Sequence, residues 1–455
     1  MTFETIDPAT GEQVGTYEPH DGTAVEDALE GAAAAFDDWR DRPIEARQEL
    51  AADLADRLRD HPTELAQVMA REMGKPLDQG VAEVEKCAWL CDYYAERAAE
   101  HLQDERIGTE PGVDSYVAYE PLGPVLAVMP WNFPFWQVLR FAVPALTAGN
   151  VALLKHSPTT FGCAEAIADL FAAAGYPAEV FQSLRIEAER VEDVIADDRV
   201  RAVTLTGSTR AGRAVAEAAG RNIKKTVLEL GGSDPYIVLD DADLDAAVET
   251  AVTARTQNSG QSCIAAKRLL VQTDVYDAFT DRFVEAMGAL EVGHPTAEAT
   301  DVGPLARADL VETLDEQVQA SVEAGARVRC GGTRPNRDGF YYHPTVLTDV
   351  PPDCPARSEE LFGPVATVVE VDSAEEAIAV ANDTEYGLSA SIWTADRDRG
   401  RRVAEQVTAG AAYVNELSKS DPRVPFGGVK DSGYGSELSR HGIREFTNAK
   451  TYWIR

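Results

Sequence analysis

The segment around Cys263 has the composition of an accessible, reactive thiol. Residues 257–263 read QNSGQSC, so small and polar residues precede the cysteine. A thiolate is a strong nucleophile, which makes Cys263 a candidate for covalent catalysis. A lone cysteine is more often structural, however, and this interpretation therefore needs partners elsewhere in the chain.

Two polar side chains stand where apolar strands are expected to end. Glu229 lies in residues 228–232 (LELGG), where a carboxylate at a strand end beside two glycines can reach into a cleft. Asn132 lies in residues 129–134 (MPWNFP), and an amide held between two prolines is a well-fixed donor to an oxyanion. The alternatives are a solvated loop acid for Glu229 and a rigid aromatic turn around Asn132.

A fourth pattern indicates phosphate binding. Residues 205–212 (LTGSTRAG) predict a strand that passes into a helix start at Gly207 and Ser208. Backbone N–H groups at such a start bind phosphate well. The signal is weaker than the GxGxxG dinucleotide fingerprint, which the sequence lacks.

The elements that position these residues alternate between helix and strand. A helical period runs from about residue 23 to 100, and short apolar strands follow at 115–120, 125–129, 151–154, 180–181, 202–205 and 226–230. A second series comes at 235–239, 268–271, 346–347, 366–370 and 412–415. Strands that alternate with helices predict an α/β fold with doubly wound parallel sheets.

Composition excludes several classes of protein. The formal net charge of −35 over 455 residues argues against nucleic-acid and anionic-membrane partners. The sequence contains neither a long apolar run nor an N-terminal signal pattern, so neither a membrane segment nor a leader is expected. The six cysteines form no CxxC pair, so we expect no metal site and reduced thiols in a cytoplasmic protein.

The same charge predicts adaptation to molar salt. At about 1 M salt the Debye length falls to about 3 Å, and the self-repulsion of an acidic chain is screened. The alternative is an ordinary acidic protein. The hypothesis that the chain is halophilic concerns its solvent and leaves its function open.

Taken together and in this order, the motifs closely resemble the aldehyde dehydrogenase superfamily. The resemblance runs from about residue 7 to 455 and includes residues 155–158 (KHSP), 359–364 (EELFGP) and 425–433 (PFGGVKDSG). It implies a Rossmann-like cofactor domain, a second α/β catalytic domain and a β-arm for oligomerisation. The implied boundaries are 1–109 with 125–230, then 231–440, then 110–124 with 441–455. The arm is expected to pair with the C-terminal strand of another subunit in a homodimer or homotetramer.

The resemblance also assigns roles. It implies that Cys263 is the nucleophile, that Glu229 is the general base and that Asn132 is an oxyanion donor. The residues that it places at the cofactor are Trp131, Lys155, Ser157, Gly207, Ser208, Glu360 and Phe362. The activity expected is oxidation of an aldehyde to a carboxylate through a thiohemiacetal and a thioester. With all three catalytic residues present, a non-catalytic relative is disfavoured.

The cofactor is expected to be NADP or NAD. Many relatives that prefer NAD carry a glutamate three residues after the lysine that corresponds to Lys155, and this chain has Pro158 there. The substitution removes a group that repels a 2′-phosphate, so NADP is favoured. Ser157 can donate to that phosphate, and His156 lies beside it.

The likeness is closest to short bacterial succinate-semialdehyde dehydrogenases. A semialdehyde with a distal carboxylate needs a cation, and Arg140 matches an arginine that related enzymes use. A second arginine of some relatives falls at Gln257 here, and compensation by Arg255, Lys419, Ser420 or Arg423 stays open. The alternative is a broad-specificity dehydrogenase for apolar or hydroxylated aldehydes. For either substrate, Phe133, Phe135 and Trp136 are expected to line an apolar tunnel.

Overall fold

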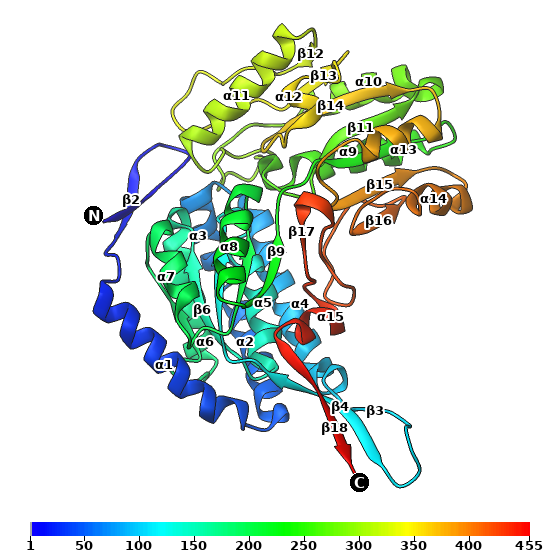
Figure 1. Ribbon diagram of the computed structural model, residues 1–455. Helices are drawn as coiled ribbons and strands as arrows, with labels where there is room; N and C mark the ends of the chain where they lie inside the picture. The colour runs from blue at the N-terminus through cyan, green and yellow to red at the C-terminus, as the bar shows by residue number, and fades with distance from the viewer. Residues whose placement is uncertain (1) are drawn as a thin grey trace.

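The structure is a computed structural model that describes residues 2–455. Two large sheets dominate it, and helices pack around each of them (Figure 1). A short hairpin of β1 (Phe3–Ile6) and β2 (Gln13–Tyr17) lies near the N-terminus. The α/β fold predicted from the alternating strands and helices is confirmed.

The first sheet is six-stranded, in the order β17-β9-β8-β5-β6-β7. All its neighbours are parallel except β17, which runs antiparallel to β9. Its central strands are completely buried because helices cover both faces, as the continuous apolar runs predict. The strands are β5 (Pro124–Met129), β6 (Val151–His156), β7 (Phe181–Ser183), β8 (Ala202–Thr206), β9 (Lys225–Glu229) and β17 (Gly433–Tyr434).

The second sheet is seven-stranded, in the order β12-β13-β14-β11-β10-β15-β16, and only β12 is antiparallel to its neighbour. The strands are β10 (Asp234–Val238), β11 (Ala266–Gln272), β12 (Arg327–Cys330), β13 (Thr345–Thr348), β14 (Val365–Val371), β15 (Ser389–Trp393) and β16 (Ala411–Val414). The predicted boundary at residues 230 and 231 falls between β9 of the first sheet and β10 of the second. The division into domains stays a prediction.

Helices α1–α8 lie in the N-terminal half, and α9–α15 follow. The first group is α1 (Gly22–Arg40), α2 (Ile44–Asp60), α3 (Pro62–Met73), α4 (Leu77–His101), α5 (Trp136–Thr147), α6 (Phe161–Ala173), α7 (Val191–Ala196) and α8 (Thr209–Arg221). The second is α9 (Leu244–Thr256), α10 (Thr273–Gly288), α11 (Ala308–Glu323), α12 (Pro355–Ser358), α13 (Ala374–Asn382), α14 (Arg397–Ala404) and α15 (Ser439–Glu445).

The two sheets present opposite edges to the predicted site. Asn132, Ser208 and Glu229 follow or end strands β5, β8 and β9, so they come from the carboxyl edge of the first sheet. Cys263 precedes β11 and Phe362 precedes β14, so both come from the amino edge of the second. Ligands bind open α/β sheets at the carboxyl ends of strands, which places a cofactor against the first sheet and the nucleophile opposite it.

A third sheet forms an arm that projects from the body (Figure 1). It contains β3 (Glu105–Arg106), β4 (Asp114–Pro121) and β18 (Thr447–Ile454), in the order β18-β4-β3. The expectation that residues 110–124 pair with the C-terminal strand of another subunit is wrong. Strand β18 pairs with β4 of its own chain from Thr447↔Pro121 to Ile454↔Asp114, and Tyr116 stacks on Tyr452 at 4.8 Å.

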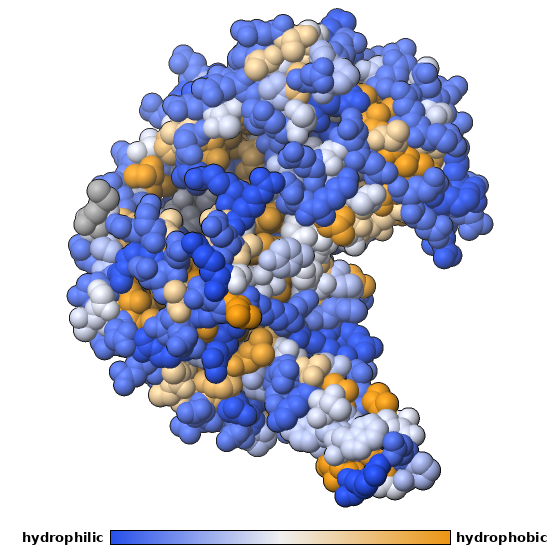
Figure 2. All heavy atoms as spheres, viewed as in Figure 1, coloured by the Kyte–Doolittle hydropathy of each residue, from blue (hydrophilic) through white to orange (hydrophobic). Residues whose placement is uncertain are grey.

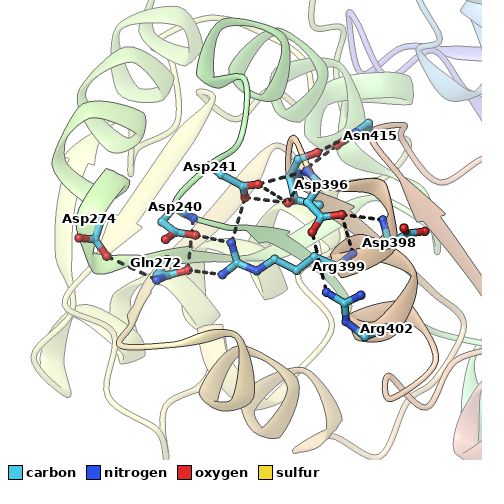
Figure 3. Close-up of polar contacts among 10 residues, drawn as sticks. Asp240, Asp241, Gln272, Asp274, Asp396, Asp398, Arg399, Arg402 and Asn415 are labelled. Carbon is cyan, nitrogen blue, oxygen red and sulfur yellow. Dashed lines mark hydrogen bonds and ion pairs between the residues drawn. The ribbon is translucent and has the colours of Figure 1, made fainter.

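An arginine network ties together the carboxyl edge of the second sheet, away from Cys263. Arg399 on α14 donates to Asp240 and Asp241, which follow β10, and to Gln272 at the end of β11 (Figure 3). Asp396 accepts from the first turn of the same helix. The cation offsets a cluster of acids that would otherwise repel one another.

Hydrophilic residues cover most of the face shown in Figure 2, in keeping with the charge of the chain. On the projecting arm a few apolar patches lie among hydrophilic residues (Figure 2), and Trp453 and Ile454 of β18 are about half exposed. Within residues 2–455, no helix has the length and apolar character that crossing a bilayer requires.

Candidate active site

Cys263 lies where two cavities meet. The first cavity, about 360 Å³, is lined by Asn132, Gly207, Ser208, Glu360 and Phe362 together with Cys263. The second cavity, about 390 Å³, is lined by Cys263 together with residues of α4 and α5. The structure therefore brings the predicted nucleophile between a site with nucleotide-binding features and a separate pocket.

The loop that carries Cys263 is held in an unusual conformation. Asn258 and Ser259 have φ angles of 55° and 54°, in the left-handed region that non-glycine residues rarely adopt. Arg255 clamps the loop, because its Nη2 donates to the carbonyl oxygens of Gly260, Leu361 and Gly363. Strain of this kind persists only where surrounding contacts enforce it.

Asn132 faces the first cavity and is fixed by two contacts. Its side-chain Nδ2 donates to the backbone carbonyl of Gln261 at 3.0 Å. The backbone carbonyl of Asn132 accepts from Asn258 Nδ2 at 2.7 Å. One N–H of the Asn132 amide remains for another acceptor. An oriented donor beside the thiol is what an oxyanion requires.

Burial raises the pKa of the Cys263 thiol to about 12, although Lys267 and Arg140 act in the opposite direction. Lys267 is itself buried, and its Nζ donates to the backbone carbonyls of Ser262 at 2.9 Å and Cys263 at 2.7 Å. The same Nζ lies 3.5 Å from Glu360 Oε1. Lys267 thus links the nucleophile loop to a predicted cofactor residue, a role that sequence reasoning missed.

Glu229 is buried but lines neither cavity. Both of its carboxylate oxygens lack a hydrogen-bond partner among residues 2–455. Burial raises its pKa well above the usual range, Glu437 raises it further, and Arg140 opposes the shift. The charges of the Arg140–Glu437 pair thus act on the predicted base, and the reach of Glu229 to a thioester on Cys263 stays a prediction.

Five of the predicted cofactor residues line the first cavity: Trp131, Gly207, Ser208, Glu360 and Phe362. The rings of Trp131 and Phe362 meet edge to face at 5.7 Å, and Glu360 Oε1 accepts from the Gly232 N–H at 3.1 Å. Arg307, which sequence reasoning did not single out, lies 5.6 Å from the centre of the Trp131 ring. An aromatic pair beside carboxylate and cation suits a nucleotide with both ring and phosphate groups.

The start of α8 supplies the phosphate features. Ser208 caps the helix, its Oγ accepting from the Ala211 N–H at 3.3 Å, and Gly207 lines the first cavity. A Cβ at Gly212 would lie 2.5 Å from Leu230 Cδ2, so glycine permits α8 to pack closely on the segment after β9. The open N–H groups of this helix start fit a pyrophosphate.

Lys155 and Ser157 lie at the end of β6, apart from the residues that line the first cavity. Lys155 is buried and donates no hydrogen bond within the described chain, and burial lowers its pKa. Ser157 Oγ accepts from the Thr159 N–H at 3.4 Å. His156 is fully buried and bonded to Pro134 and Thr160, so it does not face a phosphate as its sequence position suggested.

Arg140 lines the second cavity, but it is neither exposed nor unpaired. Its Nε forms an ion pair with Glu437 Oε2, and both side chains are 4% exposed. Its guanidinium carbon lies 4.7 Å from the centre of the Phe426 ring. The terminal nitrogens donate no hydrogen bond to residues 2–455, so they remain available to a ligand in the cavity.

Other candidates are reassigned by their contacts. Arg255 holds the nucleophile loop, Lys419 pairs with Glu416 at 2.7 Å, and Arg423 pairs with Asp421 at the surface. Phe133 and Trp136 line the second cavity as expected. Phe135 is completely buried and does not, so its predicted place in a tunnel is wrong.

Comparison with known proteins agrees with this geometry. The model of the family described as "Aldehyde dehydrogenase family" matches residues 1–452. The chain belongs to the aldehyde dehydrogenase family. It is 51% identical over 454 residues to a probable succinate-semialdehyde dehydrogenase [NADP(+)] of Synechocystis sp., and 50% identical over 456 residues to a succinate-semialdehyde dehydrogenase [NADP(+)] of Mycobacterium leprae. Each alignment covers 100% of both chains.

Solved structures show the same fold. A succinic semialdehyde dehydrogenase from Streptococcus pyogenes, in complex with NADP+, matches with a TM-score of 0.97 at 36% identity and covers 99% of each chain. A lactaldehyde dehydrogenase also matches with a TM-score of 0.97, at 33% identity, over 100% of this chain and 96% of its own. The fold is thus common to enzymes with different aldehydes, and the substrate must be argued from the second cavity.

Proposed function

We propose that this protein oxidises succinate semialdehyde to succinate with NADP+. The balanced reaction consumes the aldehyde, NADP+ and water, and yields the carboxylate, NADPH and two protons. The observation that carries the proposal is the position of Cys263 between the first cavity, with its nucleotide-binding features, and the second cavity, which contains Arg140.

The chemistry begins at the thiol. Cys263 Sγ loses its proton and attacks the aldehyde carbon, which forms a C–S bond and an oxyanion. The Asn132 amide and the Cys263 N–H stabilise that oxyanion, an effect typically worth about 3 kcal/mol for each donor. A bound NADP+ supplies the acceptor for the hydride that leaves this carbon. Glu229 then takes a proton from the water that cleaves the thioester.

The residues around the first cavity fit a dinucleotide. Gly207 and Ser208 offer backbone N–H donors to phosphate. Glu360 offers an acceptor to ribose hydroxyls, and Phe362 offers an apolar face to a nicotinamide ring. Lys155, one of the predicted cofactor residues, is a buried cation that forms no ion pair within residues 2–455, and it can donate to a hydroxyl or phosphate of the cofactor. Pro158 stands where many relatives that prefer NAD carry a glutamate that repels a 2′-phosphate, which supports NADP over NAD.

The second cavity supports a substrate with a carboxylate at its far end. The terminal nitrogens of Arg140 are free to donate to it, and Phe133, Trp136 and Phe426 provide an apolar wall for the methylene groups. The two relatives from Synechocystis sp. and Mycobacterium leprae are named as dehydrogenases of the same semialdehyde. A broad-specificity aldehyde dehydrogenase is the second candidate, because the same wall accepts an apolar chain.

The experiment is a comparison of NADPH or NADH formation with succinate semialdehyde and hexanal, each with NADP+ and NAD+. We expect the highest kcat/KM with succinate semialdehyde and NADP+. Equal or better turnover of hexanal would replace the proposed substrate with the broad-specificity alternative. Equal rates with NAD+ would refute the preference for NADP.

We further propose that the chain works as a homodimer or homotetramer in a cytoplasm of high salt. The arm exposes Trp453, Ile454 and the unpaired edge of β18, which favours burial against another copy. The six cysteines are free, as in a reducing compartment. Mass determination in about 2 M KCl tests the assembly, and a monomer there would contradict it.

A further inference from the structure

The second cavity contains a lysine that neither motif nor resemblance singled out. Lys86 lies on α4, and its Nζ is 2.8 Å from Ser420 Oγ and 4.3 Å from the centre of the Trp136 ring. Its ammonium forms no ion pair with a carboxylate of the described chain. Lys86 is half-buried, and a partly desolvated cation without a counter-ion gains from an anionic ligand.

The other charges that line this cavity are already paired. Arg140 pairs with Glu437, and Lys419 pairs with Glu416. Glu83 also lines the cavity, but it is bound to the buried Lys75. Lys86 is therefore the source of net positive charge in the second cavity.

We propose that Lys86 binds the distal carboxylate of the substrate together with Arg140, and that Ser420 orients its ammonium. This inference rests on the proposed function and deepens it. Gln257, at the position where some relatives carry a second arginine, lines the same cavity and brings no charge. Lys86 supplies the second cation from α4, a different element of the fold.

The chemistry of the two cations is complementary. Arg140 offers planar donors to both oxygens of a carboxylate, whereas the Lys86 ammonium has three donors, of which Ser420 takes one. Arg140 is close enough to lower the pKa of Lys86 by repulsion, after the larger effect of burial. A carboxylate between them relieves that repulsion, so binding of the anion is favoured over binding of an uncharged chain.

The test compares two aldehydes of equal chain length, succinate semialdehyde and butanal, of which only the first has a carboxylate. In Lys86→Met we expect KM for succinate semialdehyde to rise on the order of 10- to 100-fold, the range for loss of a charge-assisted contact. The kcat/KM for butanal should stay within about threefold. Lys86→Arg should retain most of the preference, and Arg423→Met, which removes a paired surface cation, should match the wild type.

A pH series gives a second readout that does not depend on Lys86→Met folding. Burial, with Arg140 second, lowers the pKa of Lys86 to about 8, against the opposing charges of Cys87, Glu83 and Asp421. Above that pH the free enzyme loses the ammonium, so the ratio of kcat/KM for succinate semialdehyde over butanal should fall between pH 7 and 9.5. The ratio cancels the groups that serve both substrates, and Lys86→Arg should remove this fall.

The outcomes separate this proposal from the function on which it rests. A wild type that does not prefer succinate semialdehyde over butanal overturns both. A wild type that prefers it, with the preference unchanged in Lys86→Met, overturns the role of Lys86 alone. A fall in the ratio that persists in Lys86→Arg assigns the titration to another group and also overturns it.

Discussion

Arg140 and Glu437 form a buried ion pair that is near enough to Glu229 for both charges to act on its pKa. The pair joins the end of the chain to α5, since Glu437 precedes α15 and Arg140 lies within the helix that follows the Asn132 turn. The negative charge of Glu437 raises the pKa of Glu229, and the positive charge of Arg140 lowers it. One ion pair therefore acts on both the predicted base and the predicted carboxylate site.

Glu437→Gln should change both functions in a defined direction. Without the acid, the charge of Arg140 is unopposed, so KM for succinate semialdehyde should fall. The pKa of Glu229 should also fall, because a like charge is removed. The acidic limb of the kcat profile, where Glu229 gains its proton, should then move to lower pH. A profile that moves to higher pH, or a raised KM with intact folding, would refute this account of the pair.

The free thiol of Cys263 should react slowly at neutral pH. Only the thiolate is alkylated, and burial raises the pKa of Cys263 to about 12. Below that pKa the thiolate fraction grows about tenfold per pH unit. The rate of iodoacetamide labelling, followed by peptide mass without cofactor, should therefore rise steadily from pH 7 to 9. A plateau below pH 8 would show a thiolate already formed.

Asn132→Ala should lower turnover without preventing cofactor binding. The change removes a donor fixed by Gln261, and loss of one oxyanion donor typically costs about 10²–10³ in kcat. Quenching of protein fluorescence by NADPH measures binding independently and should be unchanged. A variant with wild-type kcat would show that the oxyanion lies elsewhere.

Stability should increase with salt. With a formal net charge of −35, self-repulsion is strongest in dilute buffer and is screened as KCl rises toward about 1 M. A gain of about 1–2 kcal/mol in the free energy of unfolding corresponds to a rise in Tm of about 1–2 °C for a chain of 455 residues, because the entropy of unfolding grows with chain length. Differential scanning between 0.05 and 1 M KCl measures it. A Tm that stays level or falls over this range would contradict adaptation to salt.

Features that depend on local pattern could be predicted from the sequence. Buried parallel strands appear as continuous apolar runs, and Cys263, Asn132 and Gly207 lie in segments whose residue types already suggest their roles. Their meeting around one cavity follows from the placement of strand ends. Even so, the residues around Cys263 alone did not identify it as the nucleophile, and the family resemblance was needed to assign that role.

Features that depend on contacts distant in sequence could not be predicted. Glu437 and Arg140 are far apart in the chain, and no local sequence pattern predicts that they form an ion pair. In the sequence, Lys86 is one of several polar residues of a predicted helix and has no distinguishing pattern. Its position at the second cavity depends on how α4 packs in the fold. The contact of Lys267 with the nucleophile loop had one weak indication in the sequence, which is its position four residues after Cys263.

The central claim is a covalent path through Cys263 that Glu229 completes. The most direct measurement is intact-protein and peptide mass of Glu229→Gln, quenched after mixing with succinate semialdehyde and NADP+. The account predicts one equivalent of NADPH per site, slow further turnover and a succinyl group on Cys263. Sustained turnover at the wild-type rate with Cys263 unmodified would contradict it.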